Sequence, residues 1–206
     1  MGMMKFAVTP GFMVGGTLFK AEQLAVLGSI IGEEAKIELT NFQQLYVEMD
    51  EENAEEVKRR LSETGLQIYP AGYVTKSVIG CNFCRGAEEA GLEVAKKLNE
   101  IIAGIPTPAP MKIGYAGCAL GTSEPLLKDI GIVKMRDRYD IYIGGEPKSL
   151  KPALAVLLVA NVEAEQMITI VRKLVTYFQA NGKNKERFGK FVQRVSIENL
   201  RQAVAG

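Results

Sequence analysis

The order of secondary-structure elements in the first 70 residues constrains the fold most. Residues 4–9 form a strand-like stretch that ends at Pro10-Gly11, and a helix is predicted from about Lys20 to Ile31. Period-two and helical spacings then predict two strands, a second helix and a fourth strand, at 36–40, 45–49, 50–64 and 66–69. This βαββαβ order is the ferredoxin-like split βαβ arrangement, so the chain is expected to be α+β.

The remaining residues predict a second unit of strands and helices. A helix of about 17 residues is expected to end near Ala103, and the proline-rich link 105–110 is expected to be extended. Strands are predicted at 111–116, 130–134, 140–143 and 153–159, followed by a long helix capped by Asn161 and two short helices that meet near 195–196. The predicted domains are 1–75, a ferredoxin-like half-domain, and 76–206.

Composition excludes several classes of function. The 206 residues contain no histidine, which rules out Ser-His-Asp and Cys-His catalysis and His-ligated zinc or haem. A formal charge of +1 gives no sign of a nucleic-acid partner. No apolar run approaches the roughly 20 residues of a membrane helix, and no apolar signal core is apparent, so a cytoplasmic protein is expected. Gly15-Gly16 lacks the flanking pattern of a phosphate loop and is predicted to be a turn.

The three cysteines are the candidate metal ligands. Cys81 and Cys84 are separated by two residues, and Cys118 lies in a second glycine-containing loop. Thiolates are soft ligands that suit iron–sulfur clusters or zinc. Zinc would need a fourth ligand from Asp, Glu or water. The alternative is that all three are small buried hydrophobic residues.

Several separated motifs carry a family resemblance. They are 36–43, Lys112 to Cys118 (KIGYAGC), 129–133, 139–145 (YDIYIGG) and 186–195. In this order they resemble the nitrite and sulfite reductase family, whose members hold a [4Fe-4S] cluster next to siroheme. The resemblance implies an iron–sulfur-type domain after the ferredoxin-like half-domain.

The resemblance also implies a ligand set. Cys81, Cys84 and Cys118 would hold the cluster, and the fourth iron would take Thr122 or an exogenous group. The family's first cysteine pair is separated by five residues and its second by three, so this chain has a shortened first loop and Thr122 in place of the last cysteine. Thr122 and the next residue, Ser123, are alternatively predicted to cap a helix before Pro125.

Other cofactor contacts follow from the same resemblance. Gly117 lies next to a ligand, and Lys76 and Arg85 are the cationic candidates near the cysteines. The family motif Arg-x-Thr-x-Arg-Gln aligns with 38–43, where Glu38 and Phe42 replace both arginines and remove bidentate anion partners.

The resulting prediction is a small redox protein that uses an iron–sulfur cluster for electron transfer or small-ligand binding. One alternative is a siroheme-dependent sulfite or nitrite reductase. The other is a non-catalytic family member that binds a partner or a tetrapyrrole. Expected partners are an electron-donor protein and a second copy of the chain, because larger family members look internally duplicated.

Overall fold

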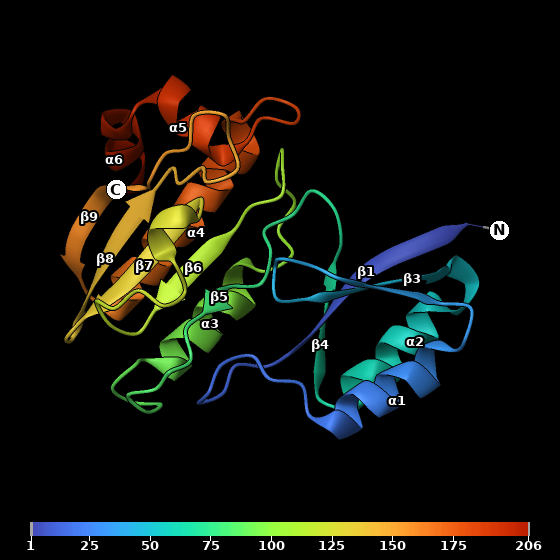
Figure 1. The fold of residues 1–206 in the computed structure, drawn as a ribbon. Coiled ribbons are helices and arrows are strands. Elements are labelled where there is room, and N and C mark those ends of the chain that lie inside the picture. The colour runs from blue at the N-terminus through green and yellow to red at the C-terminus, as the bar shows by residue number, and fades with distance from the viewer. Residues whose placement is uncertain (1, 206) are drawn as a thin grey trace.

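The computed structural model describes residues 2–205, which form two sheets with separate hydrophobic cores (Figure 1). The first sheet is antiparallel and has the order β2-β3-β1-β4. Its strands are β1 (Met3–Pro10), β2 (Lys36–Leu39), β3 (Leu45–Asp50) and β4 (Leu66–Pro70). Helices α1 (Ala21–Ile31) and α2 (Glu51–Glu63) lie together on one face of this sheet (Figure 1). The ferredoxin-like βαββαβ prediction is therefore confirmed.

Alternation along the strands builds the first core. Phe6 and Val8 of β1 point to the helix face and are at most 1% exposed. Ala54, Val57 and Leu61 repeat at helical spacing along α2 and are buried against them. Apolar residues that repeat every second position in the strands and every 3.6 positions in the helix therefore pack into one hydrophobic cluster.

The second sheet has the order β5-β6-β7-β8-β9 and is mixed. Its strands are β5 (Ile79–Gly80), β6 (Ile113–Ala116), β7 (Ile130–Met135), β8 (Arg138–Ile143) and β9 (Val156–Val162). The first three are parallel, and the last two pair antiparallel. The helices are α3 (Leu92–Ile102), α4 (Ala164–Asn181), α5 (Phe188–Val195) and α6 (Ile197–Ala205), and a 3-10 turn, η1, spans Pro125–Leu127. Within residues 2–205, none of the helices is both long and apolar enough to cross a membrane.

Two predicted elements differ from the structure. The helix α3 begins only at Leu92, because Gly86 and Gly91 have left-handed φ values of +94° and +71° that interrupt a regular helix before it. The last strand covers 156–162 with several exposed residues, rather than a buried 153–159. Asn161 lies inside that strand with φ +60°, and Glu163 takes the position that precedes α4.

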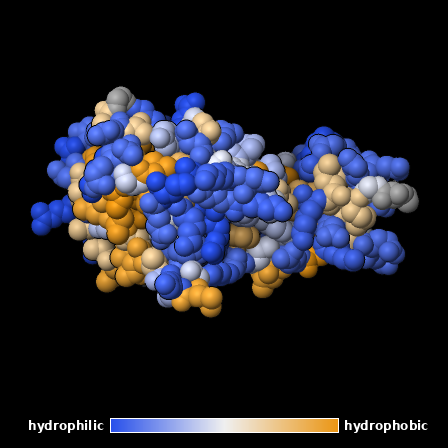
Figure 2. Space-filling view, turned by 90° about the horizontal axis from the view of Figure 1, so that it is seen from above, coloured by the Kyte–Doolittle hydropathy of each residue, from blue (hydrophilic) through white to orange (hydrophobic). Residues whose placement is uncertain are grey.

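The edge strand β9 is covered by a side chain of the last helix. The Arg201 guanidinium of α6 donates hydrogen bonds to the backbone carbonyls of Leu158 and Leu157, at 2.9 and 3.0 Å. Much of the strongly hydrophobic surface in the view from above lies over this C-terminal unit (Figure 2). Because Arg201 occupies the carbonyls of Leu157 and Leu158, these groups are not free to pair with a strand of another chain.

Candidate functional site

The Cys81–Cys84 turn follows the short strand β5. The Cys81 backbone N–H donates to the Tyr115 carbonyl at 3.0 Å, which extends the pairing of β5 with β6 by one step. Phe83 has a left-handed backbone, with φ +50°, and its ring is completely buried. As a result, Cys81 lies inside at 8% exposure, whereas Cys84 is exposed.

The Gly117–Cys118 loop follows the neighbouring parallel strand, β6. The Gly117 N–H donates to the Cys81 sulfur at 3.2 Å, so the two cysteine loops are in direct contact. A Cβ at position 117 would lie 2.8 Å from the Ala90 carbonyl oxygen, and only glycine permits this approach. Two loops at the carboxyl ends of parallel strands thus bring Cys81 into contact with the Gly117 backbone, one residue before Cys118.

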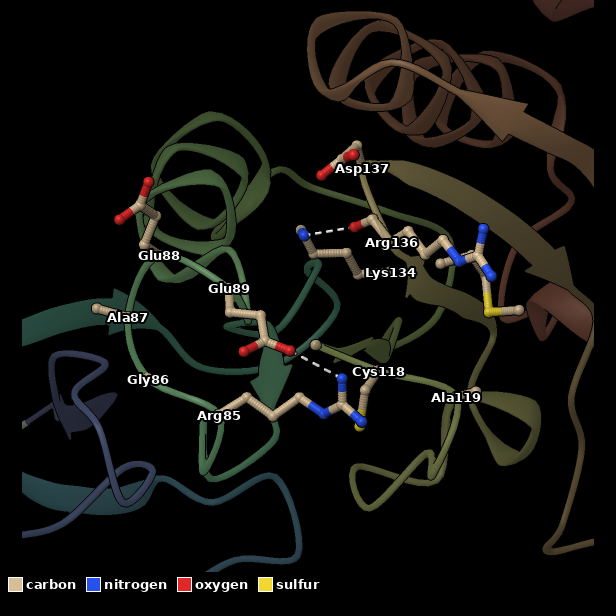
Figure 3. Close-up of a pocket in the computed structure, with 12 residues that line it drawn as sticks. Arg85, Gly86, Ala87, Glu88, Glu89, Cys118, Ala119, Lys134, Arg136 and Asp137 are labelled. Carbon is tan, nitrogen blue, oxygen red and sulfur yellow. Dashed lines mark hydrogen bonds and ion pairs between the residues drawn. The ribbon is translucent and has the colours of Figure 1, made fainter.

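A cavity of about 1020 Å³ opens beside these loops (Figure 3). Its wall comes from three segments, 85–89, 117–119 and 134–137. Figure 3 shows Arg85 and Cys118 at the same end of the cavity, with Lys134 across from them. Arg85 forms an ion pair with Glu89 at 2.8 Å, and Lys134 Nζ donates to the Arg136 carbonyl at 2.5 Å. The cavity therefore combines a thiol with a mixed rim of cationic and acidic groups.

The predicted ligands are only partly gathered. Cys118 lines the cavity, Cys81 lies behind Gly117, and Cys84 is exposed and absent from the cavity wall. Across residues 2–205 no three Cys, Asp or Glu side chains stand close enough together to hold a metal ion. Thr122 is exposed and is not among the residues that line the cavity.

The capping role expected for Thr122 and Ser123 is wrong. Glu124 precedes η1 at the cap position with a left-handed backbone, and no side chain caps the turn. Ser123 is buried, and its hydroxyl has no hydrogen-bond partner. Pro125 occupies the first turn, as expected for a residue without an N–H.

Lys76 lies away from the cavity, at the junction of the two units. It is 2% exposed, and its Nζ donates to the Gly72 carbonyl at 2.7 Å. The ammonium group is 5.2 Å from the centroid of the Phe42 ring and 5.4 Å from that of Tyr46. Burial lowers the pKa of Lys76 to about 8.

The sequence motifs gave no separate role to Lys112, which the structure places beside Lys76. Its Nζ is 5.2 Å from the same Phe42 ring, so two ammonium groups contact one aromatic ring. Burial lowers the pKa of Lys112, and its backbone N–H donates to Asp129 Oδ2 at 2.7 Å. Burial also raises the pKa of Asp129 to about 7. In the sequence, only the position of Lys112 at the start of KIGYAGC pointed to a role for this residue. In the structure both of its chain neighbours are buried.

Glu38, which replaces a family arginine, is paired rather than free. Its carboxylate lies 2.6 Å from Lys5 Nζ across the first sheet. Lys5 lies on β1, on the far side of β3 from Glu38, and its ammonium group partly offsets the negative charge of Glu38.

Comparison with known proteins gives one family match. Residues 74–206 match the model described as the nitrite and sulphite reductase 4Fe-4S domain. The chain is 26% identical over 172 residues to an assimilatory-type sulfite reductase of Nitratidesulfovibrio vulgaris, covering 82% of this chain and 78% of that protein. It is 23% identical over 189 residues to the cobalt-factor III methyltransferase of Priestia megaterium, covering 92% of this chain and 34% of that protein.

Solved structures share the fold. The NirA protein of Mycobacterium tuberculosis superimposes with a TM-score of 0.70 at 20% identity, over 98% of this chain and 39% of that one. Dissimilatory sulfite reductase I gives a TM-score of 0.74 at 11% identity, over 98% and 69%. The chain thus spans about a third of the methyltransferase and well under half of the NirA protein.

Proposed function

The chain belongs to the nitrite and sulphite reductase family, and on that basis we propose that it binds an iron–sulfur cluster through Cys81, Cys84 and Cys118. The proposed activity is electron transfer or the binding of a small ligand at the cluster. When bound, such a cluster supplies one-electron oxidation and reduction.

One observation carries the proposal, the hydrogen bond from the Gly117 N–H to the Cys81 sulfur. Backbone N–H groups that point at cysteine sulfur stabilise the thiolate form and tune the potential of iron–sulfur centres. The same contact places Cys118, the next residue, at the cavity wall. Two of the three thiols therefore belong to loops that touch.

The donor set suits the cluster in chemical type, because all three candidates are thiols and histidine is absent. Cys84 lies three residues beyond Cys81 and is exposed, so cluster binding would require its sulfur to turn toward the other two. Arg85 and Lys134 line the same cavity as Cys118, so cationic side chains lie beside the proposed ligand.

A second candidate function is binding or reduction of a small anion with siroheme. It is favoured by Lys76 and Lys112, whose ammonium groups meet at Phe42. Both pKa values are lowered by burial, so an anion between these groups would offset an unfavourable charge. The electron-donor protein and the homodimer remain predictions. Light scattering of the purified protein would measure whether the chain forms a dimer.

The test is iron and acid-labile sulfide analysis of protein purified without oxygen, with siroheme supplied during expression. We expect about four irons and four sulfides per chain and broad visible absorbance. The Cys118→Ser variant should lose the iron, whereas the control Ala119→Ser, which adds a hydroxyl in the same loop, should keep it. Sharp tetrapyrrole bands would favour the siroheme candidate. A colourless, iron-free chain would overturn the cluster proposal.

A further inference from the structure

A loop of the N-terminal unit touches the turn that carries Cys81 and Cys84. The Gly15 N–H donates to the Asn82 carbonyl at 2.6 Å. The ring of Phe12 lies 6.2 Å from that of Phe83, centroid to centroid. Asn82 and Phe83 are the two residues between the cysteines, so both contacts act on the spacer of the pair.

The glycine pair makes this approach possible. Gly15 and Gly16 have φ values of +99° and +100°, which side chains rarely adopt. A Cβ at position 16 would lie 3.1 Å from Asn82 Oδ1, closer than most such contacts. The pair is therefore a turn, as its sequence predicts, and it is also a contact surface for the cysteine turn.

Phe83 is held from both units. On the side of the second sheet, its ring stacks on Tyr115 at 6.1 Å, and Tyr115 accepts the Cys81 N–H through its backbone carbonyl. On the other side it meets Phe12, which packs against the second core although it follows β1. A buried residue with a left-handed backbone needs such support from its surroundings.

We propose that the Phe12–Gly16 loop is a positioning element for the Cys81–Cys84 thiol pair. The loop lies outside residues 74–206, the part that matches the family model. The ferredoxin-like unit therefore helps to build the thiol site of the other unit. The positioning role stands without the proposed cluster. Only its consequence, that the loop controls metal binding, rests on the proposed function.

The test compares two glycine substitutions that both place an alanine at a positive φ. Gly16→Ala places a Cβ against Asn82, whereas Gly65→Ala has a similar positive φ, +81°, and no atom within 4 Å. The full-length proteins are alkylated with iodoacetamide under reducing conditions, and peptide mass spectrometry gives the rate at each cysteine. We expect Gly16→Ala to speed Cys81 alkylation about tenfold and Gly65→Ala to leave it within about twofold.

A second variant and a metal titration keep the inference independent of any one substitution. Phe12→Leu keeps an apolar side chain but loses the ring contact, and it should also expose Cys81. Cd²⁺ titration of the reduced proteins should show about tenfold weaker binding in Gly16→Ala and Phe12→Leu than in wild type. The positioning role is refuted if Cys81 reacts at the same rate in Gly16→Ala, in Phe12→Leu, in the Gly65→Ala control and in wild type. If wild type binds no Cd²⁺ while the alkylation rates change as expected, the metal proposal fails and the positioning of the thiols stands.

Discussion

Lys76→Met measures what it costs this fold to bury an ammonium group. Lys76 is 2% exposed and donates a hydrogen bond to the Gly72 carbonyl, and burial lowers its pKa from 10.5 to about 8. Between these pH values the unfolded chain holds a proton that the folded chain has released. The free energy of unfolding therefore rises with pH across this window and falls as pH drops back through it.

The size of the effect follows from the shift. At about 1.4 kcal/mol per pKa unit the full shift corresponds to about 3 kcal/mol. Gly72, which accepts the bond, is exposed, so the ammonium end is close to water and screening reduces the value to about 1–2 kcal/mol. Methionine fills a similar volume without the charge. Near pH 7, Lys76→Met should therefore be more stable than wild type by about 1–2 kcal/mol.

The assay is urea unfolding of both proteins, followed by far-ultraviolet circular dichroism near pH 7 and near pH 10.5. The stability difference should shrink strongly at the higher pH, because Lys76 is then neutral in the folded chain and about half neutral in the unfolded chain. Taking the difference cancels the other titrating groups, and Lys36→Met, at an exposed strand position, controls for loss of a lysine. A difference that stays constant across the range would refute the claim that Lys76 is poorly solvated in the fold.

Two further predictions concern charged groups of the C-terminal unit. Arg201→Ala should free the carbonyls of Leu157 and Leu158 on the edge strand and lower the free energy of unfolding by about 1 kcal/mol. Light scattering of concentrated protein should rise because the exposed edge can pair with another chain. Unchanged scattering would show that Arg201 is not needed to protect this edge. Arg194 holds the pKa of Glu186 at about 2 by hydrogen bonding, so this carboxylate contributes stability that is present above about pH 4.5 and lost as the pH falls toward 2. Unfolding of Glu186→Gln followed between those pH values should lack that loss, and an acid sensitivity equal to that of wild type would contradict the assignment.

Local patterns predicted the first unit well because its elements are amphipathic. Ala54, Val57 and Leu61 repeat at helical spacing and are buried, and the alternating strand 45–49 pairs in register with β1. In the second unit, Met167 and Leu174 of α4 are buried for the same reason. One-sided burial leaves a periodic signal in the sequence.

The site was less predictable because it depends on backbone conformation and on distant neighbours. The start of α3 is decided by the φ values of Gly86 and Gly91, which composition does not report. Lys76 is separated from the cysteines because its segment faces Phe42 of the first unit. The support of Phe83 by Phe12 joins residues 71 positions apart in the chain, a contact that no local pattern predicts.

Two of the three cavity segments, 85–89 and 117–119, are connections between regular elements, and the third, 134–137, covers the end of β7 and the turn to β8. Side chains there contribute little to either hydrophobic core, so most of them can be exchanged at small cost to folding. The exception is Gly117, whose contact with Ala90 leaves no room for a side chain. As a result, substitutions at most cavity positions can change the chemistry of the cavity with little effect on stability, whereas a substitution at Gly117 would disturb the fold itself.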